Sequence, residues 1–474
     1  MKFIIIFLFS SVSLICAQEK QPNIILIIVD DLGYGELERQ DDGRIPTPHI
    51  DSLARDGVKF TNAYVTGPYC SASRAAIMTG RYQNRFGYEK NPTGYWNEDP
   101  RIGVPNSEWT IAEQLQRSGY TTSLIGKWHL GATAKFHPMH QGFDEFFGFM
   151  HEGHYFVPEP YEGVTTLLRK KVLPGLVKGR WTSKDGKLIY HDILGDEPDY
   201  NTNNPIVRSS QPVDVKEYLT DAFTTEAIDF MKRTSDRPFF LTLSYNAVHS
   251  PLQGLDEYMD RFTHIEDIQR RIFAAMLANL DDNIGRVLNY LKSAKIEEDT
   301  LIYFLSDNGG PTKELTSSNG VLSGSKGMLR EGGIRVPFIM RWNGTLPAGK
   351  VYHKPIISTD IFATSAAVSG VKVTHKAKRD GVNLIPYLTE KSQKEPHKVL
   401  YWKSVGQVAL RSGDWKLLKS RSLKDRTKIT PFMLFNLKDD IGETEDLSEK
   451  YPEKVQELLK IWQEIDKEMA PSLW

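Results

Sequence analysis

The chain has 474 residues, of which 40% are hydrophobic and 25% charged, so it is long enough for a large core and a second, smaller domain. Its 59 Lys and Arg residues nearly balance its 60 Asp and Glu residues, which leaves a formal net charge of −1. A chain without a strong overall field has no general attraction to nucleic acid or to an anionic membrane. We therefore expect no nucleic-acid partner, and any anionic substrate must be bound by a local site.

Residues 1–17 have the layout of a secretory signal peptide. Lys2 precedes an apolar stretch from Phe3 to Ile15, and small residues precede Gln18. The apolar stretch is shorter than the roughly 20 residues that a membrane-spanning helix needs, so we expect no stable membrane insertion. We expect export to the periplasm or the medium, with association to the cell surface left open.

Cleavage after residue 17 leaves Cys70 as the single cysteine of the mature chain. Exported proteins commonly use cysteines in disulfides, but Cys70 has no second cysteine in the chain to pair with. A buried free thiol that acts as a small hydrophobic group is the simplest alternative. The polar neighbours Ser71, Ser73 and Arg74 favour a chemical role instead.

Four apolar runs of strand length each end in polar residues. The runs are NIILIIV (23–29), TTSLIG (121–126), FFLTLSYNAV (239–248) and TLIYFL (300–305). The polar residues that follow them are Asp30 and Asp31, Lys127 and His129, His249, and Ser306, Asp307 and Asn308. Continuous apolar runs are typical of strands buried on both faces, as in a parallel sheet covered by helices. Ligands of such α/β sheets bind beyond the carboxyl ends of the strands, so the four polar clusters predict one shared site.

Helical patterns lie between the predicted strands. Residues 107–120 predict a helix with Ser107 as its N-cap and Gly119 as its stop, and residues 270–294 predict a longer amphipathic helix. Beyond residue 385, short strand-like runs precede a final helix with an apolar stripe. We therefore predict a catalytic α/β domain over residues 18–385 and a C-terminal subdomain of antiparallel sheet plus helix over residues 386–474.

The polar clusters fall into two chemical sets. Asp30, Asp31, Asp307 and Asn308 offer only hard oxygen ligands, which suit Ca²⁺ or Mg²⁺ better than zinc. Converging carboxylates repel one another, so a bound cation is expected among them. The second set, Arg74, Lys127, His129 and His249, suits the binding of an oxyanion and the transfer of protons. Together the two sets indicate hydrolysis of a phosphate or sulfate ester.

The segment CSASR (70–74), followed by AAIMTGRY, resembles the C-x-[P/A]-x-R signature of type I sulfatases. The resemblance continues in the order of that family through PNIILIIVDDLGYGE, TPHIDSLARDGVKFTNAYV, GKWHLG, GFDEFFGF, NAVHSPL, SDNGG and GSKGMLREGGIRVPFIMRW. It covers almost the whole mature chain. It implies an alkaline-phosphatase-like fold, in which a large mixed, mostly parallel sheet is flanked by helices and joined by a smaller C-terminal subdomain.

The resemblance also implies a modified nucleophile. In this family the cysteine that matches Cys70 is converted by a maturation enzyme to formylglycine, also called 3-oxoalanine. Its aldehyde hydrates to a diol, one hydroxyl attacks sulfur, and the substrate's alcohol leaves as its bond to sulfur breaks. Loss of a proton from the other hydroxyl then reforms the aldehyde and expels sulfate.

Further roles follow from the resemblance at matching positions. Asp30, Asp31, Asp307 and Asn308 would hold one Ca²⁺, which would also contact the modified Cys70. Arg74 would fix the formylglycine side chain, and Lys127 and Lys326 would hold the sulfate group. His129 would deprotonate the diol, and His249 would protonate the leaving oxygen.

The expected substrate is a sulfated polysaccharide or its oligosaccharides, such as ulvan, carrageenan or a glycosaminoglycan. One alternative is a phosphodiesterase or phosphatase of the alkaline-phosphatase-like group, which would usually have a Ser or Thr nucleophile and two zinc ions. A second is an inactive carbohydrate-binding relative, which predicts gaps among the catalytic positions. All the matched residues are present in this chain.

Overall fold

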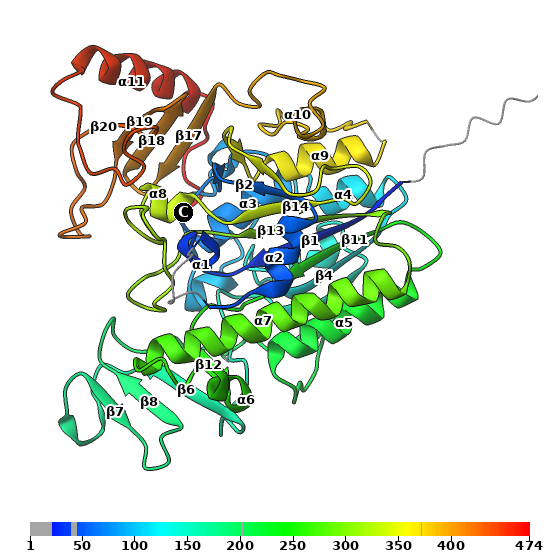
Figure 1. Ribbon diagram of the computed structural model, residues 1–474, viewed down its shortest axis with the longest axis vertical. Coiled ribbons are helices and arrows are strands. Elements are labelled where there is room, and N and C mark those ends of the chain that lie inside the picture. The colour runs from blue at the N-terminus through cyan, green and yellow to red at the C-terminus, as the bar shows by residue number, and fades with distance from the viewer. Residues whose placement is uncertain (1–20, 39–44, 201, 371) are drawn as a thin grey trace, which may run out of the picture.

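The computed structural model describes residues 21–38, 45–200, 202–370 and 372–474, so the predicted signal peptide lies outside the described residues. Its centre is a ten-stranded mixed sheet (Figure 1). In spatial order its strands are β10 (Gln211–Pro212), β9 (Val207–Arg208), β5 (Glu145–Phe149), β4 (Thr121–Lys127), β11 (Phe239–Ser244), β1 (Asn23–Val29), β13 (Thr300–Ser306), β14 (Phe338–Arg341), β2 (Val58–Phe60) and β15 (Lys350–Tyr352).

The four strands predicted from apolar runs are neighbours at the centre of this sheet. β4, β11, β1 and β13 pair in parallel and in that order. Ile28 of β1 lies opposite Ser244 of β11 and Leu305 of β13, so the strands end at the same edge. The prediction of a parallel α/β sheet is therefore confirmed, and the residues that follow each strand meet at one edge.

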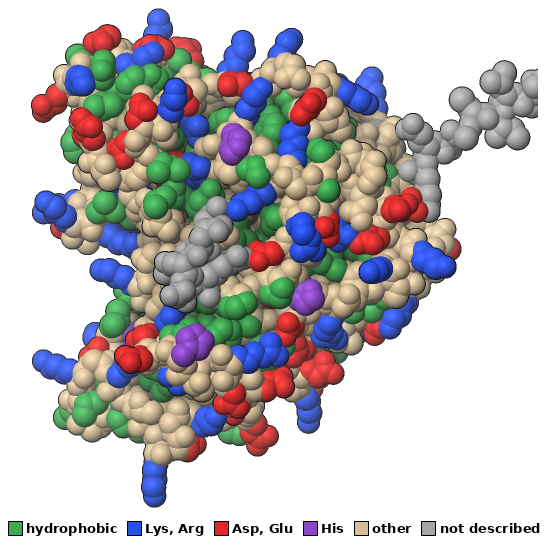
Figure 2. Space-filling view, viewed as in Figure 1, with side chains coloured by type: hydrophobic (Ala, Val, Ile, Leu, Met, Phe, Trp, Pro, Cys, Tyr) green, Lys and Arg blue, Asp and Glu red, His purple; other side chains and the backbone are tan. Residues whose placement is uncertain are grey.

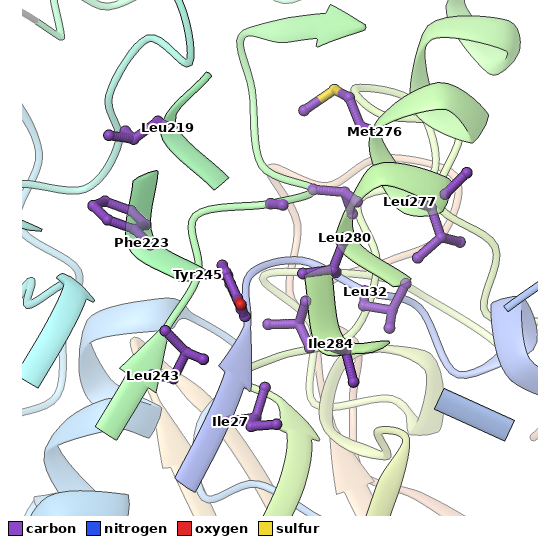
Figure 3. Close-up of a cluster of buried hydrophobic side chains, with 14 of the residues drawn as sticks. Ile27, Leu32, Leu219, Phe223, Leu243, Tyr245, Met276, Leu277, Leu280 and Ile284 are labelled. Carbon is purple, nitrogen blue, oxygen red and sulfur yellow. The ribbon is translucent and has the colours of Figure 1, made fainter. Parts of the chain in front are cut away.

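Both faces of the central strands are covered, which is why their sequences are continuously apolar. Ile25 and Ile27 of β1 belong to one core, and Ile24 and Leu26 belong to the other. The first core is covered by α2 (Pro48–Arg55), α5 (Leu219–Arg233) and α7 (Ile268–Ser293), and the second by α3 (Cys70–Thr79), α4 (Ile111–Gln116) and α9 (Asp360–Val368). Figure 3 shows Ile27 and Leu243 of the sheet near Ile284 of α7.

The predicted start of the helix in residues 107–120 is wrong. Thr110 is the N-cap, because its hydroxyl accepts a hydrogen bond from the Glu113 amide at 3.1 Å and the Glu113 carboxylate accepts one from the Thr110 amide at 2.8 Å. This reciprocal capping box satisfies two amides at once, which Ser107, three residues earlier, does not do. The helix also ends at Gln116, before Gly119.

The chain ends in a separate antiparallel sheet with one packed helix, as predicted (Figure 1). Its elements are β17 (Val399–Ser404), β18 (Gln407–Ser412), β19 (Trp415–Lys419), β20 (Met433–Asn436) and α11 (Pro452–Asp466). Val455, Leu458 and Trp462 form the buried stripe of α11. Trp402 of β17 donates from Nε1 to the carbonyl of Val65 at 2.7 Å, which ties this sheet to the segment that leads into α3.

The remaining elements are short. They are β12 (Leu252–Leu255), β6 (Val164–Arg169), β8 (Leu188–His191) and β7 (Arg180–Thr182) in one sheet, β16 (Ile356–Ile357) and β3 (Ala63–Tyr64) in another, and the helices α1 (Gly35–Glu38), α6 (Asp256–Met259), α8 (Glu331–Ile334) and α10 (Ile385–Leu388). Among the helices that the structure describes, none has the length and apolar character needed to cross a membrane.

Candidate active site

The predicted polar clusters meet at the carboxyl edge of the central sheet. One carboxylate oxygen each from Asp30, Asp31 and Asp307 and the sulfur of Cys70 all lie within 4.8 Å of one another. All four side chains are at most 1% exposed. Three carboxylates and a thiol are thus buried together, although they come from three distant parts of the chain.

Asp31 has an unusual backbone conformation that places it over the end of β13. Its φ angle is +65°, in the left-handed region that Asp tolerates better than most residues. Its amide donates to Asp307 Oδ1 at 3.3 Å. Its carboxylate accepts hydrogen bonds from Asn308 Nδ2 at 2.6 Å and from Lys326 Nζ at 2.9 Å. Asp31 therefore connects the loops that follow β1 and β13 with the loop that carries Lys326.

Cys70 is the first residue of α3, and its thiol donates to Asp30 Oδ1 at 3.4 Å. Burial, and next the negative charge of Asp30, raise the pKa of the Cys70 thiol above its ordinary value. The thiolate is the nucleophilic form of cysteine. An unmodified Cys70 is therefore a neutral thiol and a weak nucleophile in this environment.

Arg74 lies one helical turn after Cys70, on the same side of α3. Its Nε donates to Asp307 Oδ2 at 2.7 Å, and its Nη1 donates to the hydroxyl of Ser244 at 2.6 Å and to the carbonyl of Lys127 at 3.2 Å. These contacts fix the start of α3 against the edge of the sheet. Ser244 was not predicted as a site residue, because it lies within the apolar run 239–248 and only the structure shows that β11 ends at this hydroxyl.

The charges of the cluster shift the pKa values of its carboxylates in opposite directions. Lys127 Nζ lies 2.5 Å from Asp30 Oδ2. Burial alone would raise the pKa of Asp30, but Lys127, His249 and Arg74 outweigh it and hold that pKa below its ordinary value. Burial and the neighbouring charge of Asp30 raise the pKa of Asp307 to about 6.

His129 follows β4 and is fully buried, with a left-handed φ of +57°. Its Nε2 lies 2.8 Å from the carbonyl of Pro92, which can only accept, so the hydrogen-bonding pattern assigns the proton to Nε2. Its Nδ1 is buried and has no hydrogen-bond partner among the described residues. Burial, and next the charge of Lys127, lower the pKa of His129 well below its ordinary value. The ring is therefore neutral and offers Nδ1 as a free proton acceptor.

His249 lies beside the carboxylates rather than apart from them. Its Nδ1 lies 2.6 Å from the carbonyl of Ser250, which assigns a proton to Nδ1, and its Nε2 lies 3.6 Å from Asp31 Oδ2. A ring nitrogen of His249 also comes within 4.8 Å of Asp30 and Cys70. The structure thus adds an imidazole to the edge of a cluster in which the sequence indicated only oxygen ligands.

The buried oxygens fit a hard divalent cation. Asp30, Asp31 and Asp307 supply carboxylate oxygens, and Asn308 Oδ1 is buried and has no hydrogen-bond partner in the part of the chain that the structure describes. Carboxylate and amide oxygens are the ligands that Ca²⁺ and Mg²⁺ prefer. An amide oxygen that is buried but unpaired costs free energy, which a bound cation would remove.

Lys326 connects the buried cluster with open space. It lines a cavity of about 340 Å³, together with Tyr69 at the start of α3 and Arg421 and Arg426 of the C-terminal sheet. Burial would lower the pKa of Lys326, but Asp31 outweighs it and raises that pKa well above its ordinary value. The lysine is therefore a permanent cation between the carboxylates and this cavity.

Comparison with known proteins identifies the family of this chain. The sulfatase family model matches residues 22–371. Human steryl-sulfatase is 35% identical over 80% of this chain and 72% of its own length, and mouse N-acetylgalactosamine-6-sulfatase is 30% identical over 98% and 89%. The crystal structure of Ps i-CgsB in complex with k-i-k-neocarrahexaose matches with a TM-score of 0.81 and 33% identity, and covers 96% of this chain and 95% of that chain. The chain therefore belongs to the sulfatase family and is a sulfuric ester hydrolase.

Proposed function

We propose that this protein removes O-sulfate groups from a sulfated polysaccharide or its oligosaccharides, by means of a nucleophile formed from Cys70. The observation that carries the proposal is the position of Cys70, at the start of α3 and within 4.8 Å of three buried carboxylates. A carbohydrate substrate is supported by two similar proteins. One is named for N-acetylgalactosamine 6-sulfate chemistry, and the other binds a neocarrahexaose. Carrageenan, ulvan and glycosaminoglycans are the substrate classes to compare.

The environment of Cys70 argues against the unmodified thiol as the nucleophile. Burial and the charge of Asp30 keep the thiol neutral, so the unmodified side chain lacks the reactive thiolate. A formylglycine at this position would supply a hydroxyl of its hydrated aldehyde as the nucleophile. The proposal therefore requires a maturation enzyme that acts on the CSASR segment before or during folding, because Cys70 is only 1% exposed in the folded chain.

We propose Asp30, Asp31, Asp307 and Asn308 as the ligands of one Ca²⁺. When bound, this ion would stabilise negative charge on the nucleophile and on the sulfate group. The three carboxylates are balanced by Arg74, Lys127 and Lys326 without it. With the ion the site carries a net charge of about +2, which favours a sulfate ester anion.

The remaining residues divide the work of binding and proton transfer. Lys127 and Lys326 bind sulfate oxygens, and Arg74 orients the side chain at position 70. The free Nδ1 of His129 accepts a proton from the diol at position 70 as the aldehyde reforms, because its other ring nitrogen is held by the carbonyl of Pro92. A His249 ring that carries a proton on each nitrogen would donate the Nε2 proton to the leaving alcohol oxygen, while the Ser250 carbonyl fixes the ring through the N–H at Nδ1.

We also propose that residues 1–17 direct export to the periplasm or the medium. Residues 18–385 form the catalytic domain in this proposal, and residues 386–474 form the C-terminal subdomain. The subdomain borders the catalytic cavity through Arg421 and Arg426, which gives it a position from which to select substrates.

The proposed function is tested by sulfate release. The protein, matured with a formylglycine-generating enzyme, is incubated with sulfated carrageenan, ulvan and glycosaminoglycan oligosaccharides and with the corresponding phosphate esters. We expect sulfate release from at least one saccharide class. Hydrolysis of phosphate esters alone would overturn the proposal in favour of a phosphatase or phosphodiesterase.

A further inference from the structure

The cavity beside Lys326 has an uneven charge. Among the described residues, four basic side chains line it, Lys313, Lys326, Arg421 and Arg426, against one acidic side chain, Glu314. Over the face of the molecule shown in Figure 2, by contrast, basic and acidic side chains are interspersed, in agreement with the net charge of −1. The excess of positive charge is therefore a local property of the cavity.

The single carboxylate of the cavity is already neutralised. Glu314 Oε1 lies 3.1 Å from Arg169 Nη1, which belongs to β6, and accepts a hydrogen bond from the Ser250 hydroxyl at 2.9 Å. Burial opposes ionisation of Glu314, but Arg169 and Lys326 outweigh it and lower its pKa. Lys326 is itself bound to Asp31. Glu314 thus leaves the positive charges of Lys313, Arg421 and Arg426 uncompensated.

Arg421, Arg426 and Lys313 have no carboxylate partner within the ranges that the structure describes. The Nε of Arg421 is buried and has no hydrogen-bond partner among the residues that the structure places. Arg426 donates to the hydroxyl of Ser325, the residue before Lys326. Arg426 also lines the same cavity as Lys326, the lysine proposed to bind the scissile sulfate.

The two arginines are held by a fixed hairpin rather than a free loop. Thr430 donates from its amide to the Ser420 carbonyl at 2.8 Å, and Ser422 donates to the Lys428 carbonyl at 2.9 Å. The amide of Arg421 donates to Gln407 Oε1 of β18 at 3.1 Å. The backbone that carries the two guanidinium groups is therefore already ordered. Less conformational entropy is lost when these groups bind a ligand.

These observations define a second binding site for an anion. Guanidinium groups match sulfate and carboxylate oxygens with paired hydrogen bonds. Lys127 and Lys326 are the residues proposed to bind the scissile sulfate. The other basic side chains of the cavity are therefore available to bind a second anionic group. The volume of about 340 Å³ lies within the range of roughly 300–1,000 Å³ that is typical of small-molecule sites.

We infer that Arg421, Arg426 and Lys313 bind a second anionic group, a sulfate ester or a uronate carboxylate, on the same saccharide as the scissile sulfate. The inference rests on the proposed function and deepens it, because it assigns the enzyme to substrates with at least two anionic groups. It makes the C-terminal hairpin a specificity-determining element of the cavity.

The test compares three matched oligosaccharides that share one scissile sulfate. The neighbouring position carries a second sulfate in the first, a uronate in the second and only hydroxyl groups in the third. For the wild-type enzyme we expect kcat/KM for the first or second to exceed that for the third by at least about tenfold. Whichever of the first two oligosaccharides has the higher kcat/KM identifies the second anionic group as a sulfate or as a uronate.

Arg421→Ala and Arg426→Ala should each reduce this ratio of kcat/KM several-fold, and Arg426→Lys should retain more of it than Arg426→Ala. Lys424→Ala is the matched control, because Lys424 is exposed on the same hairpin and does not line the cavity. Its ratio should equal that of the wild type. Urea unfolding midpoints establish that each variant is folded.

Two results would overturn the inference while leaving the proposed function intact. One is a wild-type ratio near one among saccharides that the enzyme does hydrolyse. The other is a ratio that the arginine variants leave unchanged, or that Lys424→Ala lowers as much as they do. A wild-type enzyme that releases sulfate from none of the three would instead count against the proposed function, and the inference would fall with it.

Discussion

Arg74 and Asp307 form a buried ion pair between α3 and the end of β13, with Arg74 Nε 2.7 Å from Asp307 Oδ2. Their side chains are 2% and 0% exposed. The pair links the helix that begins at Cys70 to the strand that ends at the carboxylate cluster. Stability and the position of the nucleophile therefore depend on the same contact.

Arg74→Ala should destabilise the protein strongly. The substitution leaves Asp307 buried without its main partner, and loss of one member of a buried pair typically costs about 3–5 kcal/mol. The free energy of unfolding, measured in urea, should fall by that order. Arg101→Ala removes an exposed partner of Asp99 and should leave the unfolding midpoint almost unchanged. Equal effects of the two substitutions would contradict the structural role of Arg74.

Calcium should stabilise the folded protein through the carboxylate cluster. A ligand that binds only the folded state at 100 times its Kd adds about 2.7 kcal/mol to the free energy of unfolding. Thermal unfolding of the wild type should therefore shift upward when Ca²⁺ is added and return when it is chelated. In Asp307→Asn, which keeps an oxygen for Arg74 but removes one negative charge, this shift should be much smaller.

Asp281→Asn is the control for the calcium experiment. Asp281 belongs to a second group of potential ligands with His49 and Asp282, but its oxygens already accept hydrogen bonds from the amides of His49 and Ile50. The Ca²⁺-dependent shift should persist in this variant. If Asp281→Asn abolished the Ca²⁺-dependent shift in thermal unfolding and Asp307→Asn retained it, the cation would be assigned to the group formed by His49, Asp281 and Asp282.

His129→Ala should lower kcat far more than it changes KM. The free Nδ1 of this buried ring is the proposed proton acceptor, and general-base groups typically contribute about 10²–10⁴-fold to the rate. Steady-state kinetics with a sulfated oligosaccharide measure the effect. His140→Ala, at an exposed histidine outside the cluster, should retain the wild-type kcat. A kcat within twofold of the wild type in His129→Ala would exclude this role.

The pair of His397 and Asp360 should make stability depend on pH. His397 Nε2 lies 2.8 Å from Asp360 Oδ1. Burial alone would lower the pKa of His397, but Asp360 outweighs it and raises that pKa above the ordinary value of 6.5. Because the folded state favours protonated His397, the pair makes its full contribution to the free energy of unfolding below about pH 6.5. This contribution is lost as the pH rises through the pKa of His397 in the folded state.

His397→Gln tests that dependence. The difference in free energy of unfolding between the wild type and this variant should be largest near about pH 5.5 and should shrink toward about pH 8.5. Urea titrations at several pH values measure it. A difference that stays constant over this range would mean that the ring contributes packing alone.

The sequence predicted the central strands well because their burial leaves a simple pattern. β1, β4, β11 and β13 are covered on both faces, so their apolar runs are continuous and their ends are marked by the first polar residues. The N-cap of α4 was mispredicted, because the apolar pattern does not locate the first residue of the helix. The reciprocal hydrogen bonds between Thr110 and Glu113 determine where α4 begins. The short strands β2 and β15 have no continuous apolar run. They are placed by pairing, β2 with both β14 and β15 and β15 with β2.

For the site, parallel strand order alone brings Asp30, Lys127 and Asp307 to one edge. Lys326 was placed by family resemblance only, because nothing in the spacing shows that the loop after β13 returns to Asp31. The contact between His129 and Pro92 depends on a tertiary arrangement that no local pattern encodes. The same holds for the entry of Arg421 and Arg426 into the cavity from the C-terminal sheet.

The origin of the nucleophile from Cys70 can be measured as the mass of residue 70 in active enzyme. Preparations made with different amounts of the maturation enzyme are digested, and the mass of the peptide that carries residue 70 is determined alongside the rate of sulfate release. We expect specific activity to rise in proportion to the fraction of peptide with the lower mass of formylglycine. Full activity in a preparation whose residue 70 is entirely unmodified cysteine would contradict it.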